Sequence, residues 1–512
     1  MSDASPDEAA PSIDELHSLT AGSEPDRRWR DLVHPPAYEN PNPPPRYNLV
    51  VLGGGTAGLV SAIGASVLGA RVALVERALL GGDCLNFGCV PSKALIRAAT
   101  AAYEARSIAE LGVRVAGVDV DFARVMERVR AARAEVAPHD AAKQVASFGV
   151  DVFFGDGRFV SRDVIEVEGK RLRFRKAILA TGGRPAVPSI PGLAQAGFLT
   201  NETVFSLTTL PRRLAVLGGG PVGCELAQAF ARLGAEVTLV QRGPRLLPRE
   251  DEDASQLLVD QFRRERMDVR LQTQIARVER SGMSSVLVLD AGGGRIEIDA
   301  ILVATGREPS LRGLGIEAAE IAVNEQGVIV DRHLRTTNRR VLAAGDVASQ
   351  YKFTHAADAL ARLALQNALF FGRKKAGSLV IPWCTYTDPE IAHVGITTRE
   401  AARMGGVATH TLALDLVDRA IVESDRRGFA RVHVDARGRI LGATLVSRHA
   451  GELISEVVLA MTSGLRLTDV GRAVVPYPTR SEVWKRLADE HARTRLTPPL
   501  RGILARWFDL VR

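Results

Sequence analysis

The sequence predicts an α/β protein with two similar parallel-sheet units and a C-terminal α+β domain. The first observation is a pattern of strand, glycine-rich turn, helix and strand that begins at Tyr47 and returns at Arg213. The second is equal spacing: in both copies, 23 residues separate the first glycine of the turn from the residue that ends the second strand. The third is a change after residue 379 to alternating strands followed by a helical run.

Length and composition suit a globular protein of several domains. The 512 residues are 46% hydrophobic and 24% charged, so the core is large enough to bury a sizeable cofactor. The net charge is +7, but the body of the chain has no long basic run and no zinc-finger spacing, so we expect no nucleic-acid partner. Four cysteines and an acidic N-terminus without an apolar signal segment predict a cytoplasmic protein.

The patterns divide the chain into consecutive parts. The first 46 residues contain nine prolines and nine acidic residues against four arginines, which predicts a disordered or extended tail. The first unit and a later return to it are predicted over 47–185 and 311–378, the second unit over 186–310, the α+β domain over 379–490 and a basic amphipathic extension over 491–512.

Each glycine-rich turn matches the pattern GxGxxG. Glycines permit the tight turn and let backbone N–H groups approach a pyrophosphate at a helix N-terminus. Each turn follows a strand and opens a helix, so the sequence predicts two Rossmann-like dinucleotide-binding domains. The glycines assigned to the cofactors are Gly53, Gly55 and Gly58 in the first turn and Gly218, Gly220 and Gly223 in the second.

The residues at the ends of the second strands distinguish the two cofactors. Glu76 lies 23 residues after Gly53, and a carboxylate there suits an unphosphorylated ribose such as that of FAD. Gln241 lies 23 residues after Gly218 and is followed by Arg242. An amide removes repulsion against a 2′-phosphate, which arginine can bind, so we expect NADPH in preference to NADH. A solvated Arg242 is the alternative, and the change from glutamate to glutamine carries the prediction.

A third motif, GGDCLNFGCVPSK, places Cys84 and Cys89 five residues apart at a helix start, with Lys93 close behind. Such cysteines can close a small disulfide ring, and the helix N-terminus and the lysine lower a thiolate pKa. The alternatives are half of a zinc site and inert buried cysteines. Zinc requires more ligands at metal spacing, whereas Cys224 and Cys384 stand alone and are assigned to the core, so no metal site is predicted.

Together these motifs resemble the class I pyridine nucleotide-disulfide oxidoreductases, which include glutathione reductase, dihydrolipoamide dehydrogenase and mercuric reductase. The resemblance covers about residues 47–490 and includes GGGTAG, the cysteine motif, ATGG, GGGPVG, ATGREP and Ala344-Gly345-Asp346, in that order. It implies a glutathione reductase-like fold with an FAD-binding domain, an inserted NAD(P)-binding domain and a C-terminal dimerisation domain, and therefore a homodimer.

The resemblance also implies roles for single residues. Cys89 lies against the flavin and Cys84 faces the substrate as the interchange thiol. Lys93 pairs with Glu225 near the flavin, and Asp346 binds the ribityl chain. The other cofactor-binding positions carried over by the resemblance are Gly82, Lys93, Thr181, Gly182, Gly306 and Gly345.

The C-terminal domain indicates the branch of the family. Disulfide-reducing members supply a His-Pro pair and then a glutamate to the partner's active site, where they act as acid and base. This chain has Tyr477 before Pro478, followed by Glu482. A tyrosine with an ordinary pKa of about 10 is a poor base at neutral pH. Mercuric reductase is similar in having a tyrosine here, so a mercuric reductase-like enzyme with a small-molecule or metal-ion acceptor is predicted, with both residues as catalytic candidates.

Two departures from that branch keep other functions open. Mercuric reductase usually ends in a vicinal cysteine pair and often begins with a metal-binding domain, whereas Cys384 is the last cysteine here. The alternatives are a dihydrolipoamide or general disulfide reductase, a membrane-associated NAD(P)H:quinone-type flavoprotein, and a flavin-bearing regulatory protein without turnover. The intact cysteine pair argues against the last of these.

The final stretch has an apolar stripe at helical spacing beside several arginines. The favoured interpretation is a helix that docks on its own or the partner subunit. The other interpretation is peripheral contact with a membrane surface. The residues that define the stripe and its basic flank are Leu500, Ile503, Leu504, Trp507 and Val511, with Arg501, Arg506 and Arg512.

Overall fold

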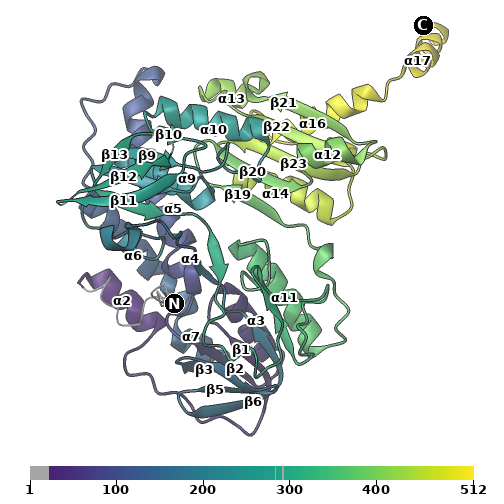
Figure 1. Ribbon diagram of the computed structural model, residues 1–512. Helices are drawn as coiled ribbons and strands as arrows, with labels where there is room; N and C mark the ends of the chain where they lie inside the picture. The colour runs from purple at the N-terminus through teal and green to yellow at the C-terminus, as the bar shows by residue number, and fades with distance from the viewer. Residues whose placement is uncertain (1–21, 283, 291–292) are drawn as a thin grey trace. The chain divides into compact units, whose positions relative to one another are not determined.

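The computed structural model describes residues 22–282, 284–290 and 293–512 (Figure 1). Contacts divide the chain into two compact units. The first unit comprises Met1–Arg242 and Thr273–Leu379, of which residues 1–21, 283 and 291–292 are not described. The second comprises Gly243–Gln272 and Val380–Arg512. The finer domain boundaries drawn from the sequence remain predictions.

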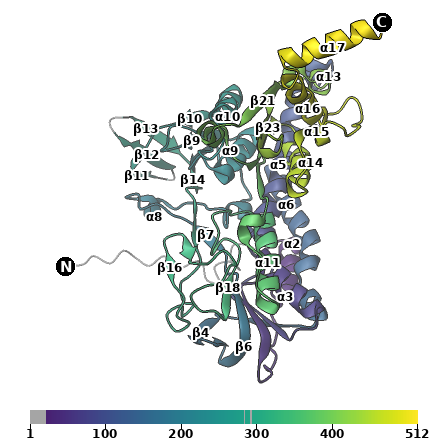
Figure 2. The ribbon, with the colours of Figure 1, turned by 90° about the vertical axis from the view of Figure 1, so that its right-hand side faces the viewer.

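A mostly parallel sheet forms the base of the first unit. Its order is β3-β2-β1-β6-β5-β4, and β18 pairs in parallel with β6. Helices α3 and α11 lie side by side against this sheet and share one apolar core with it (Figure 2). The bounds are β1 Tyr47–Leu52, β2 Val72–Glu76, β3 Val150–Phe154, β4 Arg158–Ser161, β5 Val164–Val167, β6 Lys170–Leu179, β18 Val341–Ala343, α3 Thr56–Val67 and α11 Thr354–Leu369.

The second of the two dinucleotide-binding patterns also lies in the first compact unit. Strands β9, β8 and β14 pair in parallel, and α9 follows the glycine turn after β8. The antiparallel sheet β11-β12-β13 packs beside them, and β15 pairs with β7 where the chain returns. The bounds are β7 Gly183–Pro185, β8 Arg213–Leu217, α9 Pro221–Leu233, β9 Glu236–Val240, β11 Ile275–Ser281, β12 Ser284–Leu289, β13 Arg295–Ile298, β14 Ala300–Val303 and β15 Arg307–Pro309.

Helices between the two sheets carry the cysteine motif. Helix α5 packs along both α6 and α9, and the short α4 precedes it. The bounds are α4 Gly82–Asn86, α5 Cys89–Ser107, α6 Phe122–Val136, α7 Ala142–Ser147 and α8 Leu193–Ala196, with the two-residue strands β16 Val323–Asn324 and β17 Gly327–Val328.

The second unit has the predicted α+β character. Five antiparallel strands in the order β19-β20-β23-β22-β21 are covered by α14 and α16, and Trp484 is fully buried in their core. The bounds are α10 Glu252–Arg264, β10 Asp268–Arg270, β19 Pro382–Thr385, β20 Glu390–Gly395, α12 Thr398–Met404, β21 Ala408–Ala413, α13 Asp418–Val422, β22 Phe429–Val434, β23 Ile440–Ser447, α14 Ala450–Thr462, α15 Leu467–Val470, α16 Glu482–Thr494 and α17 Pro498–Leu510.

The structure corrects the prediction of a disordered or extended tail over 1–46. Helix α2, Glu24–Val33, is capped by Ser23 and buries Trp29 and Val33 in the core of the first unit. Composition averaged over 46 residues conceals this one amphipathic helix, whose apolar residues find their partners only in the folded sheet. Residues 34–46 of the predicted tail form neither helix nor strand, and residues 1–21 lie outside the described residues.

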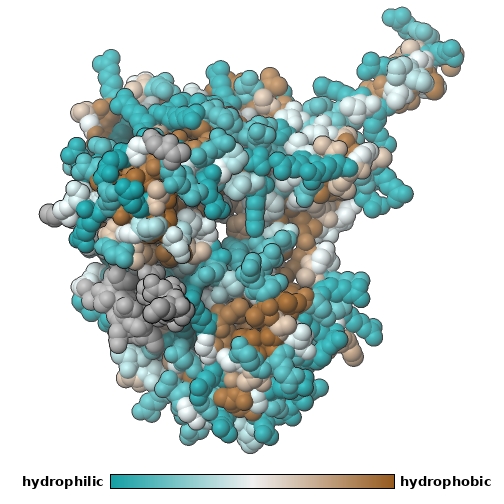
Figure 3. Space-filling model, in the orientation of Figure 1, coloured by the Kyte–Doolittle hydropathy of each residue, from teal (hydrophilic) through white to brown (hydrophobic). Residues whose placement is uncertain are grey.

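The predicted C-terminal extension, 491–512, begins inside helix α16, which continues to Thr494. Its first residue, His491, is buried. Helix α17 then exposes Ile503, Trp507 and Phe508, and Figure 3 shows hydrophobic and hydrophilic residues side by side on it. Within the described ranges, none of the helices combines the length and apolar character needed to cross a membrane.

Candidate active site

The first glycine turn allows the backbone to pass closer than any side chain would permit. Gly53 has a φ of +107°, and a Cβ there would lie 2.4 Å from the Ala180 carbonyl oxygen. A Cβ on Gly58 would lie 1.7 Å from the Gly53 oxygen. Gly55 stands at the N-terminus of α3, where a Cβ on Gly82 would come within 2.6 Å of its Cα. A side chain therefore would not fit at Gly53, Gly58 or Gly82, and this close backbone packing at the helix N-terminus suits a pyrophosphate.

Glu76 holds this turn from the end of β2. Its Oε2 accepts a hydrogen bond from the Gly54 N–H at 2.6 Å, and its Oε1 accepts one from the Ala78 N–H at 2.7 Å. Burial raises the pKa of this carboxyl, and the two backbone donors act in the opposite direction. The side chain therefore lies at the edge of the turn, as a ribose-binding carboxylate requires.

The second turn has almost the same geometry with an amide in place of the carboxylate. A Cβ on Gly218, whose φ is +110°, would lie 2.4 Å from the Ala304 oxygen, and one on Gly223 would lie 1.9 Å from the Gly218 oxygen. The Gly219 N–H donates to Gln241 Oε1 at 3.0 Å. A Cβ on Gly220 would enter open space at the start of α9, so this glycine leaves room for a ligand rather than for the protein's own backbone.

The two motif cysteines lie at the junction of α4 and α5, and both are free thiols. Cys89 is the first residue of α5, and its Sγ lies 3.3 Å from Thr354 Oγ1. A hydrogen bond from Cys84, together with Thr354 and the charge of Lys93, outweighs burial and lowers the pKa of Cys89 to about 6. The same hydrogen bond and burial raise the pKa of Cys84. Cys89 is therefore the thiolate of the pair at neutral pH.

An ion pair stands one helical turn beyond Cys89. Lys93 Nζ lies 2.7 Å from Glu225 Oε2, which is buried at the start of α9. The pairing that the family resemblance implies is therefore present. It joins the cysteine helix to the helix of the second glycine turn.

Arg307 is a site residue that the sequence argument missed. Its buried guanidinium lies 3.2 Å from Asp83 and 3.3 Å from Asp346, and it donates to the Gly183 oxygen at 2.6 Å. Burial is the main cause that raises the pKa of Asp346, and Arg307 opposes it. The sequence could have indicated this residue, because Arg307 lies within the ATGREP motif and its partner Asp83 directly precedes Cys84.

The remaining cofactor positions predicted from the sequence also lie in the first unit. Thr181 Oγ1 donates to the Ser310 oxygen at 2.8 Å, which ties the ATGG turn to the chain that follows β15. Gly182 and Gly306 have positive φ values and face open space, whereas a Cβ on Gly345 would lie 3.3 Å from the Ala57 Cβ at the start of α3. Arg242 is exposed.

Comparison with known proteins identifies the family. A family model described as "Pyridine nucleotide-disulphide oxidoreductase" matches residues 47–361, and the model of its dimerisation domain matches residues 381–488. This chain belongs to that family. The family uses FAD and NAD(P)H, so the protein is an FAD-dependent NAD(P)H oxidoreductase of the flavoprotein disulfide reductase type, and the dimerisation domain makes it a homodimer. The fold class, family, cofactors and homodimer predicted from the sequence are confirmed.

The relatives within the family differ in their acceptors. Mercuric reductase of Bacillus cereus is 34% identical over 441 residues, which cover 85% of this chain and 70% of that protein. Mercuric reductase of Streptomyces lividans is 35% identical over 450 residues and covers 86% and 95%. Dihydrolipoyl dehydrogenase of Thermus scotoductus is 34% identical and covers 85% and 95%. Among solved structures, the HOCl-induced flavoprotein disulfide reductase RclA of Escherichia coli has a TM-score of 0.77 at 29% identity and covers 86% and 99%.

The second unit presents the catalytic candidates of this oxidoreductase's dimerisation domain. Tyr477 is 73% exposed on a surface loop, and its hydroxyl donates to Asp418 at 2.8 Å. That hydrogen bond and the Asp418 charge raise the pKa of Tyr477. Arg480 anchors the loop through Glu423, and Glu482 begins α16 with a buried Oε2 that has no hydrogen-bond partner among the described residues.

Cys224 and Cys384 lie on other elements than the motif cysteines. Cys224 is fully buried in α9, and Cys384 is half-buried in β19 beside the core of the second unit. Over the described part of the chain, no three His, Cys, Asp or Glu side chains form a group that could hold a metal ion.

Proposed function

We propose that this enzyme uses the Cys84–Cys89 dithiol to reduce a thiol-bound soft metal ion, with Hg(II) as the test substrate. The observation that carries the proposal is Tyr477, which stands where disulfide-reducing members carry histidine and whose pKa is raised further by Asp418. Mercuric reductases at 34–35% identity support the same branch.

The first glycine turn, Glu76 and the cluster around Arg307 would hold FAD. Backbone N–H groups at the start of α3 suit its pyrophosphate, Glu76 suits its adenosine ribose, and Asp346 suits its ribityl hydroxyls. When bound there, FAD passes two electrons from the nicotinamide to the cysteine pair. Cys89 would face the flavin, Cys84 would face the acceptor, and the Lys93–Glu225 pair would fix the helix between them.

The second glycine turn would hold NADPH in preference to NADH. The open space at Gly220 accommodates a pyrophosphate, and Gln241 already binds the Gly219 N–H without a negative charge. A 2′-phosphate at this strand end would therefore meet an amide and the exposed Arg242 instead of a carboxylate.

Reduction of thiol-bound Hg(II) requires two thiolates to bind the metal and two electrons to reduce it. Two thiolates displace the ligands of Hg(II) and bind it, since soft metals favour thiolate sulfur. The hydride of one NADPH supplies the two electrons that convert Hg(II) to Hg(0), so NADPH, one proton and the dithiolate complex of Hg(II) give NADP⁺, Hg(0) and two thiols. The displaced thiolates leave by ligand exchange at the metal and are protonated by solvent afterwards, so a neutral Tyr477 is no disadvantage.

A small disulfide is the second candidate acceptor, favoured by the dihydrolipoyl dehydrogenase relative. Reduction of a disulfide by NADPH consumes one proton and releases two thiols. That proton must reach the leaving sulfur, and a phenol whose hydrogen is donated to Asp418 is a weak source at neutral pH.

Steady-state turnover of the purified, FAD-loaded dimer distinguishes the two acceptors. We expect the rate of NADPH oxidation with Hg(II) in excess thiol to exceed the rate with glutathione disulfide or lipoamide across the neutral range, about pH 6.5 to about pH 8. Faster turnover of either disulfide across that range would replace the metal proposal by the disulfide one. Equal NADH and NADPH efficiencies would contradict only the assignment of Gln241.

The proposal also covers the cellular location of the enzyme and the surface to which helix α17 binds. We place the enzyme in the cytoplasm and propose that α17 docks on protein rather than on lipid. Its exposed apolar residues, Ile503, Trp507 and Phe508, are accompanied by Asp509 as well as by arginines, which weakens binding to an anionic surface. Sedimentation with anionic vesicles tests this, and binding that is lost on truncation at Thr497 would reverse it.

A further inference from the structure

Asn86 is the best-anchored residue of the turn between the two redox cysteines. It ends α4 two residues after Cys84 and three before Cys89, and it is 1% exposed. Its amide nitrogen donates to the Leu80 oxygen at 3.1 Å, and its amide oxygen accepts from Trp29 Nε1 at 2.8 Å. The side chain therefore joins the cysteine turn to helix α2.

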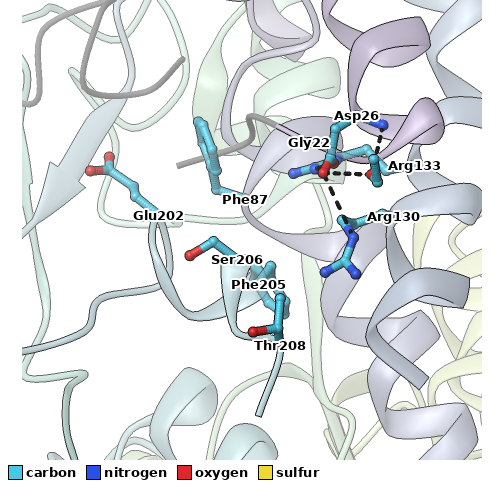
Figure 4. A pocket seen from close by; sticks show the side chains of 10 residues that line it. Gly22, Asp26, Phe87, Arg130, Arg133, Glu202, Phe205, Ser206 and Thr208 are labelled. Carbon is cyan, nitrogen blue, oxygen red and sulfur yellow. Dashed lines mark hydrogen bonds and ion pairs between the residues drawn. The ribbon is translucent and has the colours of Figure 1, made fainter. Parts of the chain in front are cut away.

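The backbone of Asn86 is held from the same side. A short helix leaves its last carbonyl groups without partners, and Arg133 donates to the Asn86 carbonyl at 3.1 Å. Arg133 in turn lies 3.8 Å over the ring of Trp29 and pairs with Asp26 at 2.7 Å. Figure 4 shows Asp26 between Arg133 and Arg130. Two residues of α2 thus converge on Asn86, one directly and one through Arg133.

These contacts are more specific than anchoring the helix requires. Val33 of α2 is fully buried, and its carbonyl accepts from the Leu80 N–H, so apolar packing and main-chain bonding already attach α2 to the sheet. A buried hydrogen bond aimed at a side chain adds geometric selectivity at a desolvation cost. Helix α2 also precedes the matched family region, which begins at residue 47.

We propose that α2 positions the redox turn: Trp29 and Asp26, through Asn86 and Arg133, hold the two sulfurs at a separation suited to both the disulfide and the dithiol. This inference rests on the proposed redox role of Cys84 and Cys89. Disulfide closure depends on how often the two thiols meet, so a loosened turn lowers their effective concentration and favours the dithiol. Phe87, the next residue, lines a cavity of about 360 Å³ together with Asp26, Arg130 and Arg133 (Figure 4).

Trp29→Phe tests the proposal, because it keeps an aromatic ring for Arg133 and removes the N–H donor. The full-length dimer, loaded with FAD, is equilibrated in dithiothreitol buffers of graded redox ratio, alkylated and analysed by mass spectrometry. We expect the Cys84–Cys89 equilibrium to shift toward the dithiol by about tenfold, since one buried acceptor loses its partner. Asp31→Asn is the matched control, because Asp31 lies on the same helix with its side chain 55% exposed.

A second variant protects the test against a folding defect. Asp26→Asn removes the charge that holds Arg133 and keeps the shape, and it should shift the equilibrium in the same direction by about threefold to tenfold. FAD content and circular dichroism identify folded dimers for either variant. An equilibrium within twofold of the parent in a folded, FAD-loaded variant overturns the proposal. A parent in which the pair does not titrate as a two-electron couple overturns the proposed function instead, so the two failures are distinguishable.

Discussion

At the scale of single residues, the division of labour within the cysteine pair follows from their surroundings. Cys89 has Thr354 and Lys93 beside it, whereas Asp83 directly precedes Cys84. We expect Cys89→Ser to abolish the long-wavelength absorbance band that a thiolate gives beside an oxidised flavin. Cys84→Ser should keep that band and lower turnover by more than about 1,000-fold. Full turnover of both variants with every acceptor would show that the pair is structural.

The pKa of Cys89 predicts a pH dependence with a definite sign. Its value of about 6 lies below that of an ordinary thiol, so the thiolate persists above pH 6 and is protonated as the pH falls. The long-wavelength band of the two-electron-reduced enzyme should therefore lose half its amplitude near pH 6, as a stopped-flow titration can measure. A midpoint near the ordinary thiol value of about 8.5 would show that neither the hydrogen bond from Cys84 nor the nearby lysine acts as described.

Gln241 is the residue at which donor preference should change. A carboxylate in its place would repel the 2′-phosphate of NADPH and accept the ribose hydroxyl of NADH. We expect Gln241→Glu to move the ratio of kcat/KM for the two donors toward NADH by about tenfold or more. Glutamate can still accept the Gly219 N–H, as Glu76 accepts that of Gly54, so FAD content and thermal stability should stay unchanged. An unaltered ratio would place the specificity elsewhere.

At the scale of elements, the two glycines of the second turn separate a ligand contact from a fold contact. A Cβ on Gly220 enters open space, so Gly220→Ala should fold normally and raise the KM for NADPH by about tenfold. A Cβ on Gly223 would lie 1.9 Å from the Gly218 oxygen, so Gly223→Ala should cost about 1–3 kcal/mol of stability. Thermal melts and steady-state kinetics of both variants test this. A Gly220→Ala enzyme with the parent KM would remove the assignment of this turn to the nucleotide.

Helix α2 depends on tertiary contacts for its stability. Its sequence has an N-cap serine and apolar residues at helical spacing, yet its proline- and acid-rich flanks resemble those of a disordered tail. A helix of this length is marginal by itself. Packing of Trp29 against the core and its hydrogen bond to Asn86 stabilise it, and neither partner can be found from periodicity alone.

At the scale of the whole molecule, the homodimer should build each active site from both subunits. The family resemblance places Tyr477 and Glu482 beside the partner's cysteines, and the 73% exposure of Tyr477 leaves it free to take that place. Chains with Cys84→Ser should be inactive, and chains with Tyr477→Phe should be impaired because the resemblance makes Tyr477 a catalytic candidate. Refolding the two together should restore up to about half of the parent's activity per mixed dimer, since one intact site forms. Activity no greater than the sum of the separate variants would show that each subunit is self-sufficient.

The sequence by itself determined the two glycine turns, the strands around them and the cysteine pair, because each depends on neighbours within about 25 residues along the chain. The φ of Gly53 and the approach of Gly58 are local requirements that only glycine meets. The pairing of Lys93 with Glu225 needed the resemblance, since 132 residues separate them. Only the tertiary structure disclosed Arg307 between Asp83 and Asp346, and Trp29 on Asn86. These contacts join segments distant in sequence, and the energy of burying polar groups together, which has no signature along the chain, decides which of them form.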